Sequence, residues 1–311
     1  MNGRLGEEQH DILPGFKNRK IYLYRGEEAT LIYKEGGFNK AVLSIHGFAS
    51  YFTNEELANR YLANGYNFYA VDLRNYGRSI RDEDKRFYID DMRSYFEELD
   101  IAVDYVSSRN NEILLSGFSM GGLISSIYLK EGFNRGKINR LFLHSPLFKF
   151  RTNLVKRIPF GSFLMGMGRR FSNFKINFNV ERYKGILERF DSKGRYKHFL
   201  MKNKRIPLHL NWFKTMSDNI DKLSKGLNLE IPILVLSSTK TYDFSKETRI
   251  TESDLVLDVK DIKERAPLVG ENVEVRQIEG GAHDLFISAE EAKEETYTAL
   301  FEWLKKNEGV V

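Results

Sequence analysis

Short apolar runs alternate with stretches of helical spacing along most of the chain, and this alternation restricts the possible folds more than any other feature. Strand-like apolar runs occupy residues 21–24, 29–33, 41–45, 67–71, 112–115, 140–144, 231–236 and 273–278. Stretches with helical spacing lie at residues 55–64, 88–107, 122–130 and 290–306. Several runs are continuously apolar, which is typical of strands that helices cover on both faces. The alternation therefore predicts an α/β fold with a mostly parallel central sheet flanked by helices.

The first two apolar runs differ from the others because only a short turn at Gly26 separates them. Strands joined in this way pair antiparallel. We therefore expect a hairpin at one edge of the sheet.

The alternation stops between about Leu147 and Leu227, where we find no strand pattern. A chain of 311 residues is long enough for one large α/β domain with an insertion. We expect a core formed by residues 1–146 and 228–311, with residues 147–227 inserted as a mainly helical cap.

Charge is distributed unevenly between these parts. Residues 149–225 contain 19 Lys and Arg but only 5 Asp and Glu, whereas the rest of the chain contains 29 basic and 38 acidic residues. A basic surface attracts anionic groups, so we expect the cap to meet anionic head groups or, transiently, a membrane surface. The segment carries no recognisable nucleic-acid-binding module, and we expect no nucleic-acid partner.

The chain contains no cysteine, which excludes disulfides, thiolate metal sites and a cysteine nucleophile. Its first residues, MNGRLGEEQH, are polar where a secretory signal needs a basic start and an apolar stretch. No run of about 18 apolar residues, the length of a membrane-spanning helix, occurs. We expect a cytoplasmic protein.

The residues from Gly117 to Gly121 read G-F-S-M-G, directly between an apolar strand and a helical stretch. In such a turn a strained backbone lifts the serine above the sheet, and small residues on either side prevent collisions. The following helix directs its N-terminal amides at the place where an oxyanion forms during acyl transfer. Ser119 is therefore the predicted nucleophile, and Met120 N–H one oxyanion donor.

A second donor must come from another loop. His46, Gly47 and Phe48 follow the strand that ends at Ile45, and we choose Phe48 N–H. His46 is a conceivable base, but its place before a glycine favours a role in shaping this loop.

Six histidines are candidates for the general base: His10, His46, His144, His198, His209 and His283. Only His283 follows the last predicted strand, in a glycine-containing turn before the terminal helix. An imidazole there can take the serine proton and return it to the leaving group. His144, at the end of a strand, is the main rival, and we expect it instead to be a buried, hydrogen-bonded histidine.

The acid that orients this histidine should lie after the strand at residues 231–236. The sequence offers Asp243, Asp254, Asp258 and Asp261 there. Spacing alone leaves the choice open.

Four motifs together resemble the α/β-hydrolase superfamily, and within it the serine aminopeptidase S33 or lysophospholipase-like group that includes monoacylglycerol lipases. They are His46–Gly47, the stretch D-L-R-N-Y-G-R-S at residues 72–79, the Ser119 turn and His283. The second is similar to the group's D-x-R-G-x-G-x-S loop, with Asn75 in place of a glycine. The resemblance covers the chain outside the cap. It implies that Asp254, the first aspartate of S-D-L-V-L-D, is the triad acid, after an insertion around residues 239–251.

The resemblance implies a serine hydrolase that cleaves carboxylic esters of small molecules or lipids through an acyl-enzyme, with no metal and no cofactor. Phe148, Phe163 and Met165 of the cap are candidates for an acyl pocket, although such residues serve equally well to pack the cap onto the core. An aminopeptidase or amidase would use the same machinery. A non-catalytic protein on this scaffold would be expected to lack a triad member. Oligomeric state and acyl length do not follow from the sequence.

Overall fold

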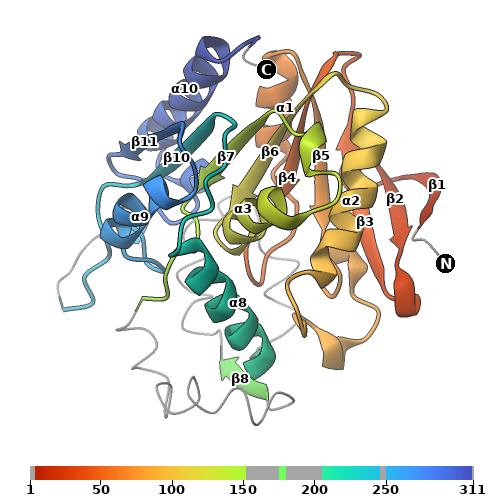
Figure 1. Ribbon diagram of the computed structural model, residues 1–311, viewed down its shortest axis with the longest axis horizontal. Coiled ribbons are helices and arrows are strands. Elements are labelled where there is room, and N and C mark those ends of the chain that lie inside the picture. Colours follow the sequence, from red (N-terminus) through yellow and green to blue (C-terminus); the bar gives the residue numbers. More distant parts are fainter. Residues whose placement is uncertain (1–3, 152–174, 180–204, 246–249, 310–311) are drawn as a thin grey trace.

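Nine strands of the described residues form one sheet through the centre of the molecule (Figure 1). The computed structural model describes residues 4–151, 175–179, 205–245 and 250–309. The strands are β1 Arg4–His10, β2 Lys17–Tyr22, β3 Glu28–Lys34, β4 Lys40–Ile45, β5 Tyr66–Asp72, β6 Glu112–Phe118, β7 Arg140–His144, β10 Ile233–Ser238 and β11 Val273–Ile278. Their spatial order is β1-β2-β3-β5-β4-β6-β7-β10-β11.

The sheet is parallel from β5 through β4, β6, β7 and β10 to β11. Its other end, from β1 through β2 and β3 to β5, is antiparallel. The central strands are almost completely buried, as their continuous apolar runs indicate. The predicted mostly parallel sheet is confirmed, and its parallel strands all end at one edge.

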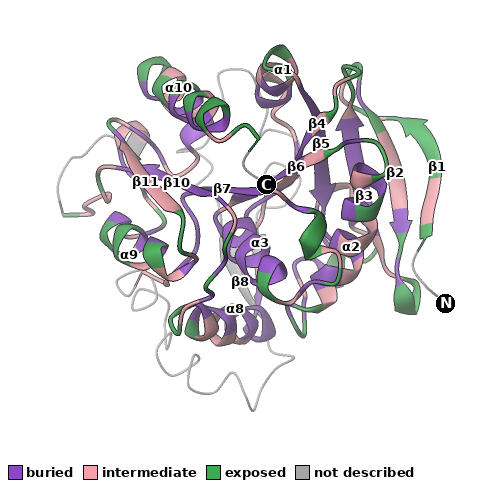
Figure 2. Ribbon diagram, turned by 45° about the horizontal axis from the view of Figure 1, so that its top comes forward, coloured by how far each residue is buried: buried purple, intermediate pink, exposed green. Residues whose placement is uncertain are grey.

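Helices cover both faces of the sheet (Figure 2). The helices are α1 Glu55–Ala63, α2 Ser94–Ser107, α3 Met120–Glu131, α8 Leu210–Leu223, α9 Val259–Arg265 and α10 Glu290–Lys306. Buried residues of α1 and α10 form a core on one face, and those of α2, α3, α8 and α9 form the core on the other. Short 3-10 turns occur at Tyr24–Gly26, Gly77–Ser79, Glu83–Lys85, Arg135–Lys137, Ile250–Glu252, Ala266–Leu268 and Leu285–Ile287. None of the helices in the described ranges is long and apolar enough to cross a membrane.

The predicted hairpin forms between β2 and β3, but its place at the sheet edge is wrong. Strand β1 pairs antiparallel with β2 on the outside and is itself the edge strand. Its sequence, RLGEEQH, is mostly polar and exposed. A strand that buries so little side chain leaves no apolar run in the sequence, which is why it was missed.

The expectation that residues 147–227 contain no strand is also wrong. Strands β8 Lys175–Asn179 and β9 Arg205–His209 pair antiparallel in a separate two-stranded sheet. Helix α8 begins directly after β9 and packs against α3. Most other residues of the expected cap lie outside the described residues, so its boundaries and mainly helical character stay predictions.

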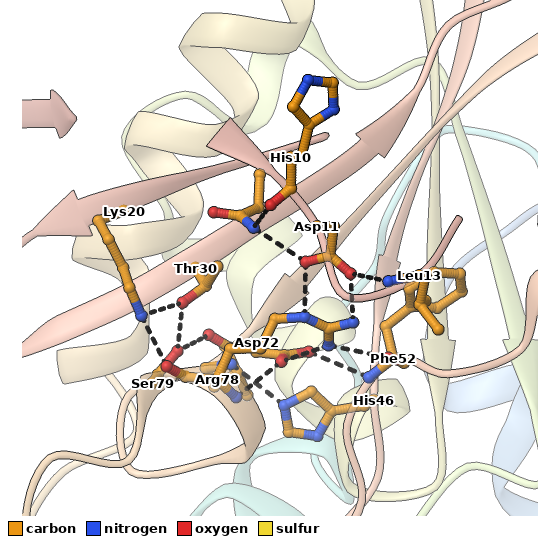
Figure 3. A network of polar contacts seen from close by, with 12 residues as sticks. His10, Asp11, Leu13, Lys20, Thr30, His46, Phe52, Asp72, Arg78 and Ser79 are labelled. Carbon is orange, nitrogen blue, oxygen red and sulfur yellow. Dashed lines mark hydrogen bonds and ion pairs between the residues drawn. The ribbon is translucent and has the colours of Figure 1, made fainter. Parts of the chain in front are cut away.

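A network of buried charges joins the N-terminal segment to the loop after β5 (Figure 3). The guanidinium of Arg78 donates to both carboxylate oxygens of Asp11, each at 2.8 Å, and to Asp72 at 2.9 Å. Neither aspartate side chain is exposed. Burial opposes the charged form of Arg78, but Asp72 and Asp11 outweigh burial and raise the pKa of Arg78. The segment between β1 and β2 is thereby fixed to the loop of residues 72–79.

Asp11→Asn should therefore lower the free energy of unfolding by about 3 kcal/mol, because it leaves a buried guanidinium with one carboxylate instead of two. Urea unfolding followed by circular dichroism measures this loss. Glu7→Gln, which removes an exposed carboxylate of β1, is the matched control and should change stability by less than about 0.5 kcal/mol. Equal stability of the two variants would contradict the assigned importance of this network.

Candidate active site

Ser119 occupies the single-residue turn between β6 and α3. Its backbone has φ 51° and ψ −115°, a conformation that is strained for a residue with a side chain. The strain is typical of a serine held above a sheet at the start of a helix. The residue is buried, with 8% of its surface exposed.

The glycines around Ser119 are required by close backbone packing. A Cβ atom at Gly121 would lie 2.3 Å from the carbonyl oxygen of Ile45. A Cβ atom at Gly117 would lie 2.6 Å from the carbonyl oxygen of Gly121. Because contacts this short do not occur for real side chains, only glycine lets α3 approach β6 and the end of β4 so closely. The G-x-S-x-G spacing is thus a steric requirement of this turn.

The structure brings the predicted nucleophile, base and acid together in one chain of hydrogen bonds. His283 Nε2 lies 3.1 Å from Ser119 Oγ, and His283 Nδ1 lies 2.9 Å from Asp254 Oδ2. His283 comes from the loop after β11, where Gly280 adopts a positive φ of 67°. Residues 164 positions apart in the chain therefore meet at the carboxyl edge of the sheet.

Asp254 is fully buried and fixed on both sides of its carboxylate. Its Oδ1 accepts the backbone N–H groups of Val256 and Leu257, both at 2.8 Å, which leaves Oδ2 for His283. Its backbone pairs with residues 240–242, shortly after the end of β10, in an isolated bridge. These bonds orient the carboxylate toward the imidazole.

The other three candidate acids have different partners. Asp243 accepts from the backbone and side chain of Ser245, Asp258 caps the N-terminus of α9, and Asp261 pairs with Lys149. Of the four, only Asp254 contacts His283.

The loop after β4 passes directly beside the nucleophile. A Cβ atom at Gly47 would lie 3.2 Å from Ser119 Cβ. His46 Nε2 accepts the backbone N–H of Leu73 at 3.1 Å, so its Nδ1 carries the proton and donates to Gly47 O at 2.8 Å. Burial lowers the pKa of His46 and keeps this ring neutral. Both ring nitrogens bond to backbone, so His46 shapes this loop.

Phe48 and Met120 flank Ser119 on two separate elements, as expected for an oxyanion hole. Met120 is the first residue of α3, where a helix leaves its N–H groups unpaired. In the part of the chain that the structure describes, neither Phe48 N–H nor Met120 N–H donates to a protein acceptor. Both amides remain available for a substrate oxygen.

Comparison with known families agrees with this arrangement. The profile of the family described as serine aminopeptidase, S33, matches residues 38–290, which is most of the chain. The chain belongs to the S33 family of α/β hydrolases. The matched region begins before β4 and ends at the first residue of α10, so it includes Ser119, Asp254 and His283.

Individual relatives support the same fold. An AB hydrolase superfamily protein of Bacillus subtilis (strain 168), YisY, is 27% identical over 255 residues, covering 76% of this chain and 89% of that protein. A monoglyceride lipase of Saccharomyces cerevisiae has a TM-score of 0.71 at 16% identity, covering 98% of this chain and 96% of the lipase. A monoacylglycerol lipase of Paleococcus ferrophilus has a TM-score of 0.63 at 17% identity, covering 86% of this chain and 96% of that structure. The predicted α/β-hydrolase fold is confirmed.

His144 of this S33 hydrolase packs beside Ser119's neighbour Phe118 and is not part of the hydrogen bonds that join Ser119, His283 and Asp254. Its ring stacks on Phe118 at 4.7 Å and on Phe142 at 5.6 Å. The prediction that His144 is buried is confirmed. The expected hydrogen bonding is incomplete, because His144 Nδ1 has no hydrogen-bond partner among the described residues. Burial, with a smaller contribution from the charge of His283, lowers the pKa of His144 to about 3.

The predicted acyl-pocket residues have mixed outcomes. Phe148 is fully buried in the core on the α3 face, so it packs the interior, and its role as a substrate contact stays a prediction. Phe163 and Met165 lie outside the described residues. Within the described ranges no group of three or more metal-ligating side chains comes together.

Sequence reasoning did not bring together the aromatic cluster beside the site, although it named two of its members, Phe48 as an oxyanion donor and Phe150 as a further candidate for the acyl pocket. Phe48 packs on Phe87 and on Trp212 of α8, and Trp212 also contacts Phe150 and Phe213. These residues are far apart in the chain, so no local pattern predicts that they meet. The cluster supplies an apolar surface next to the predicted oxyanion donors.

His144→Leu should make stability less dependent on pH in the acid range. In the unfolded chain this imidazole binds a proton below its ordinary pKa of 6.5, whereas in the folded protein it binds one only near pH 3. Acid therefore favours unfolding between these values, by up to about 1.4 kcal/mol per pH unit from this one group.

Urea unfolding at pH 7, 6, 5 and 4 measures the effect. At pH 7 the two proteins differ only by the packing effect of the substitution, and from pH 6 to pH 4 wild type should lose stability more steeply than the variant. Parallel curves would show that His144 is not the buried neutral group described.

Proposed function

We propose that this S33 hydrolase cleaves carboxylic esters through an acyl-enzyme intermediate, with Ser119 as nucleophile. One observation carries the proposal: the continuous hydrogen bonds from Ser119 Oγ to His283 and from His283 to Asp254. The first bond has the separation that proton transfer from the serine requires, and the second has the separation of the hydrogen bond that orients the imidazole. The same constellation performs acyl transfer on several unrelated folds.

In the proposed reaction, His283 Nε2 takes the proton of Ser119 while Oγ bonds to the ester carbonyl carbon. The carbonyl oxygen becomes an oxyanion and accepts from the amides of Phe48 and Met120. The imidazolium then returns the proton to the departing alkoxide, which leaves as an alcohol. Water, activated by His283 in the same way, releases the carboxylic acid and restores the serine.

Asp254 holds His283 in the tautomer with the proton on Nδ1, so that Nε2 is free to accept from Ser119. It also stabilises the imidazolium that forms during both steps. Because Oδ1 is already occupied by two backbone donors, the carboxylate cannot rotate away without losing them.

An ester of an apolar acyl group is the substrate that the surroundings favour, as in a carboxylesterase, lysophospholipase or monoacylglycerol lipase. The aromatic cluster of Phe48, Phe87, Phe150, Trp212 and Phe213 lies beside the oxyanion donors. Two solved structures of similar fold are a monoglyceride lipase and a monoacylglycerol lipase. The alternative is an aminopeptidase or amidase, which the family description names and the same triad would serve.

Attraction of anionic lipids or a membrane surface by the basic segment stays a proposal, because most of that segment lies outside the described residues. A cytoplasmic location likewise stays a prediction.

Ser119→Ala should abolish turnover of p-nitrophenyl butyrate and labelling by a fluorophosphonate probe, because both need the serine oxygen. Circular dichroism should show an unchanged fold, since alanine fits the space of the serine. Parallel assays of p-nitrophenyl esters and amino-acid arylamides separate an esterase from an aminopeptidase. Full retention of ester turnover by the alanine variant would refute the nucleophile assignment.

Asp254→Asn should lower kcat about 10⁴-fold with little loss of stability. The asparagine oxygen can still accept from Val256 and Leu257, but its NH2 group then faces His283 Nδ1 and favours the tautomer that cannot accept the serine proton. Asp243→Asn is the matched control, because Asp243 bonds to Ser245 in its own turn, and it should leave kcat within about 2-fold. Equal effects of the two substitutions on kcat would exclude Asp254 as the acid.

A further inference from the structure

Trp212 of α8 contacts both residues whose amides are the proposed oxyanion donors. Its indole Nε1 lies 3.2 Å from Met120 Sδ, and its ring centroid lies 4.3 Å from that of Phe48. Trp212 is buried, with 5% of its surface exposed. One side chain from the segment between β7 and β10 therefore touches both halves of the oxyanion hole.

These two halves have no direct covalent connection. Phe48 lies in the loop after β4, and Met120 begins α3. The distance between their N–H groups is thus set by side-chain packing as well as by the backbone. Hydrogen-bond donors in an oxyanion hole act only when they are aimed at the position of the developing charge. A contact shared by both residues fixes their relative position.

Two further neighbours of these residues come from the loop after β5. Tyr76 OH lies 3.5 Å from Met120 Sδ, so the sulfur is held between Tyr76 and Trp212. The ring of Phe48 also packs on Phe87 at 5.2 Å. Trp212 supplies the contacts that reach these residues from α8.

We propose that Trp212 is a positioning residue that holds the amides of Phe48 and Met120 at the spacing which the oxyanion requires. This inference rests on the proposed ester hydrolysis. Under this proposal α8, which contributes no residue to the Ser119 turn or to the triad, helps to stabilise the transition state. Trp212 acts through Met120 and Phe48 and takes no part in proton transfer.

A positioning role differs from two simpler roles of the same side chain. If Trp212 only bound the acyl chain, its loss would raise KM for long esters and spare p-nitrophenyl acetate. If it only stabilised the fold, its loss would reduce the fraction of active protein, while each remaining active site would keep its kcat. A positioning residue instead lowers kcat per active site for short and long esters alike.

The experiment compares wild type with Trp212→Leu and Trp212→Phe on p-nitrophenyl acetate and octanoate. Fluorophosphonate titration counts active sites, and an alkyl trifluoromethyl ketone, whose serine adduct places an oxyanion in the hole, probes transition-state binding. We expect Trp212→Leu to lower kcat for both esters about 10- to 100-fold, with KM changed less than about 3-fold. The inhibition constant of the ketone should rise in proportion to the loss in kcat/KM.

Trp212→Phe keeps a ring against Phe48 but loses the N–H at Met120 Sδ, and its effect should be intermediate. It also keeps the test decisive should the leucine variant fold poorly. The matched control is Ile220→Ala, because Ile220 is a buried apolar residue of α8 about two turns from Trp212 and is not part of the aromatic cluster. This control should keep kcat per active site within about 2-fold of wild type.

An unchanged kcat per active site in both Trp212 variants, or a loss confined to the octanoate ester, overturns the positioning role while leaving ester hydrolysis in place. A wild-type protein that turns over no ester overturns the proposed function, and this inference with it. The two failures are therefore distinguishable in the same set of assays.

Discussion

The close approach of α3 to β6 and to the end of β4 is the constraint on which the rest of the site depends. It is possible only because Gly117 and Gly121 have no Cβ, and it forces Ser119 into a strained backbone conformation. The strain is sustained because β6 and α3 are both buried in the core and cannot shift to relieve it. The hydroxyl and the Met120 amide thereby obtain fixed positions at the carboxyl edge of the sheet.

The loop that contains Phe48, the second proposed oxyanion donor, is held by charge as well as by backbone proximity. Asp72, at the end of β5, accepts the backbone N–H of Phe52 and pairs with Arg78, which itself donates to Phe52 O (Figure 3). The same arginine is fixed by Asp11, between β1 and β2. An edge strand that contributes almost nothing to the core is thus linked to the loop that contains Phe48. Such buried ion pairs cost desolvation energy and add little net stability, so their main effect here is to hold this loop in one conformation.

The sequence predicts features that are encoded by residues close together in the chain, and it does not predict those that depend on contacts between distant residues. The Ser119 turn is encoded within five residues, and His283 is set by its place after the last strand, so both could be placed from local pattern. Asp254 needed the resemblance to a family, because a longer loop follows β10 and several aspartates meet the spacing. Strand β1 has no apolar signal, and the contact of Trp212 with Met120 joins residues 92 positions apart, which no local pattern reveals.

The segment between β7 and β10 touches the site at both of its described ends. At its start, Lys149 pairs with Asp261, and Arg151 donates to the carbonyl oxygens of Tyr242 and Leu255, on either side of the acid in sequence. At its end, α8 brings Trp212 against the two oxyanion residues. One end therefore supports the loop that contains Asp254, the partner of His283, and the other supports the two residues whose amides are the proposed oxyanion donors. The proposed acyl transfer needs these two parts together, so under that proposal the inserted segment belongs to the catalytic framework.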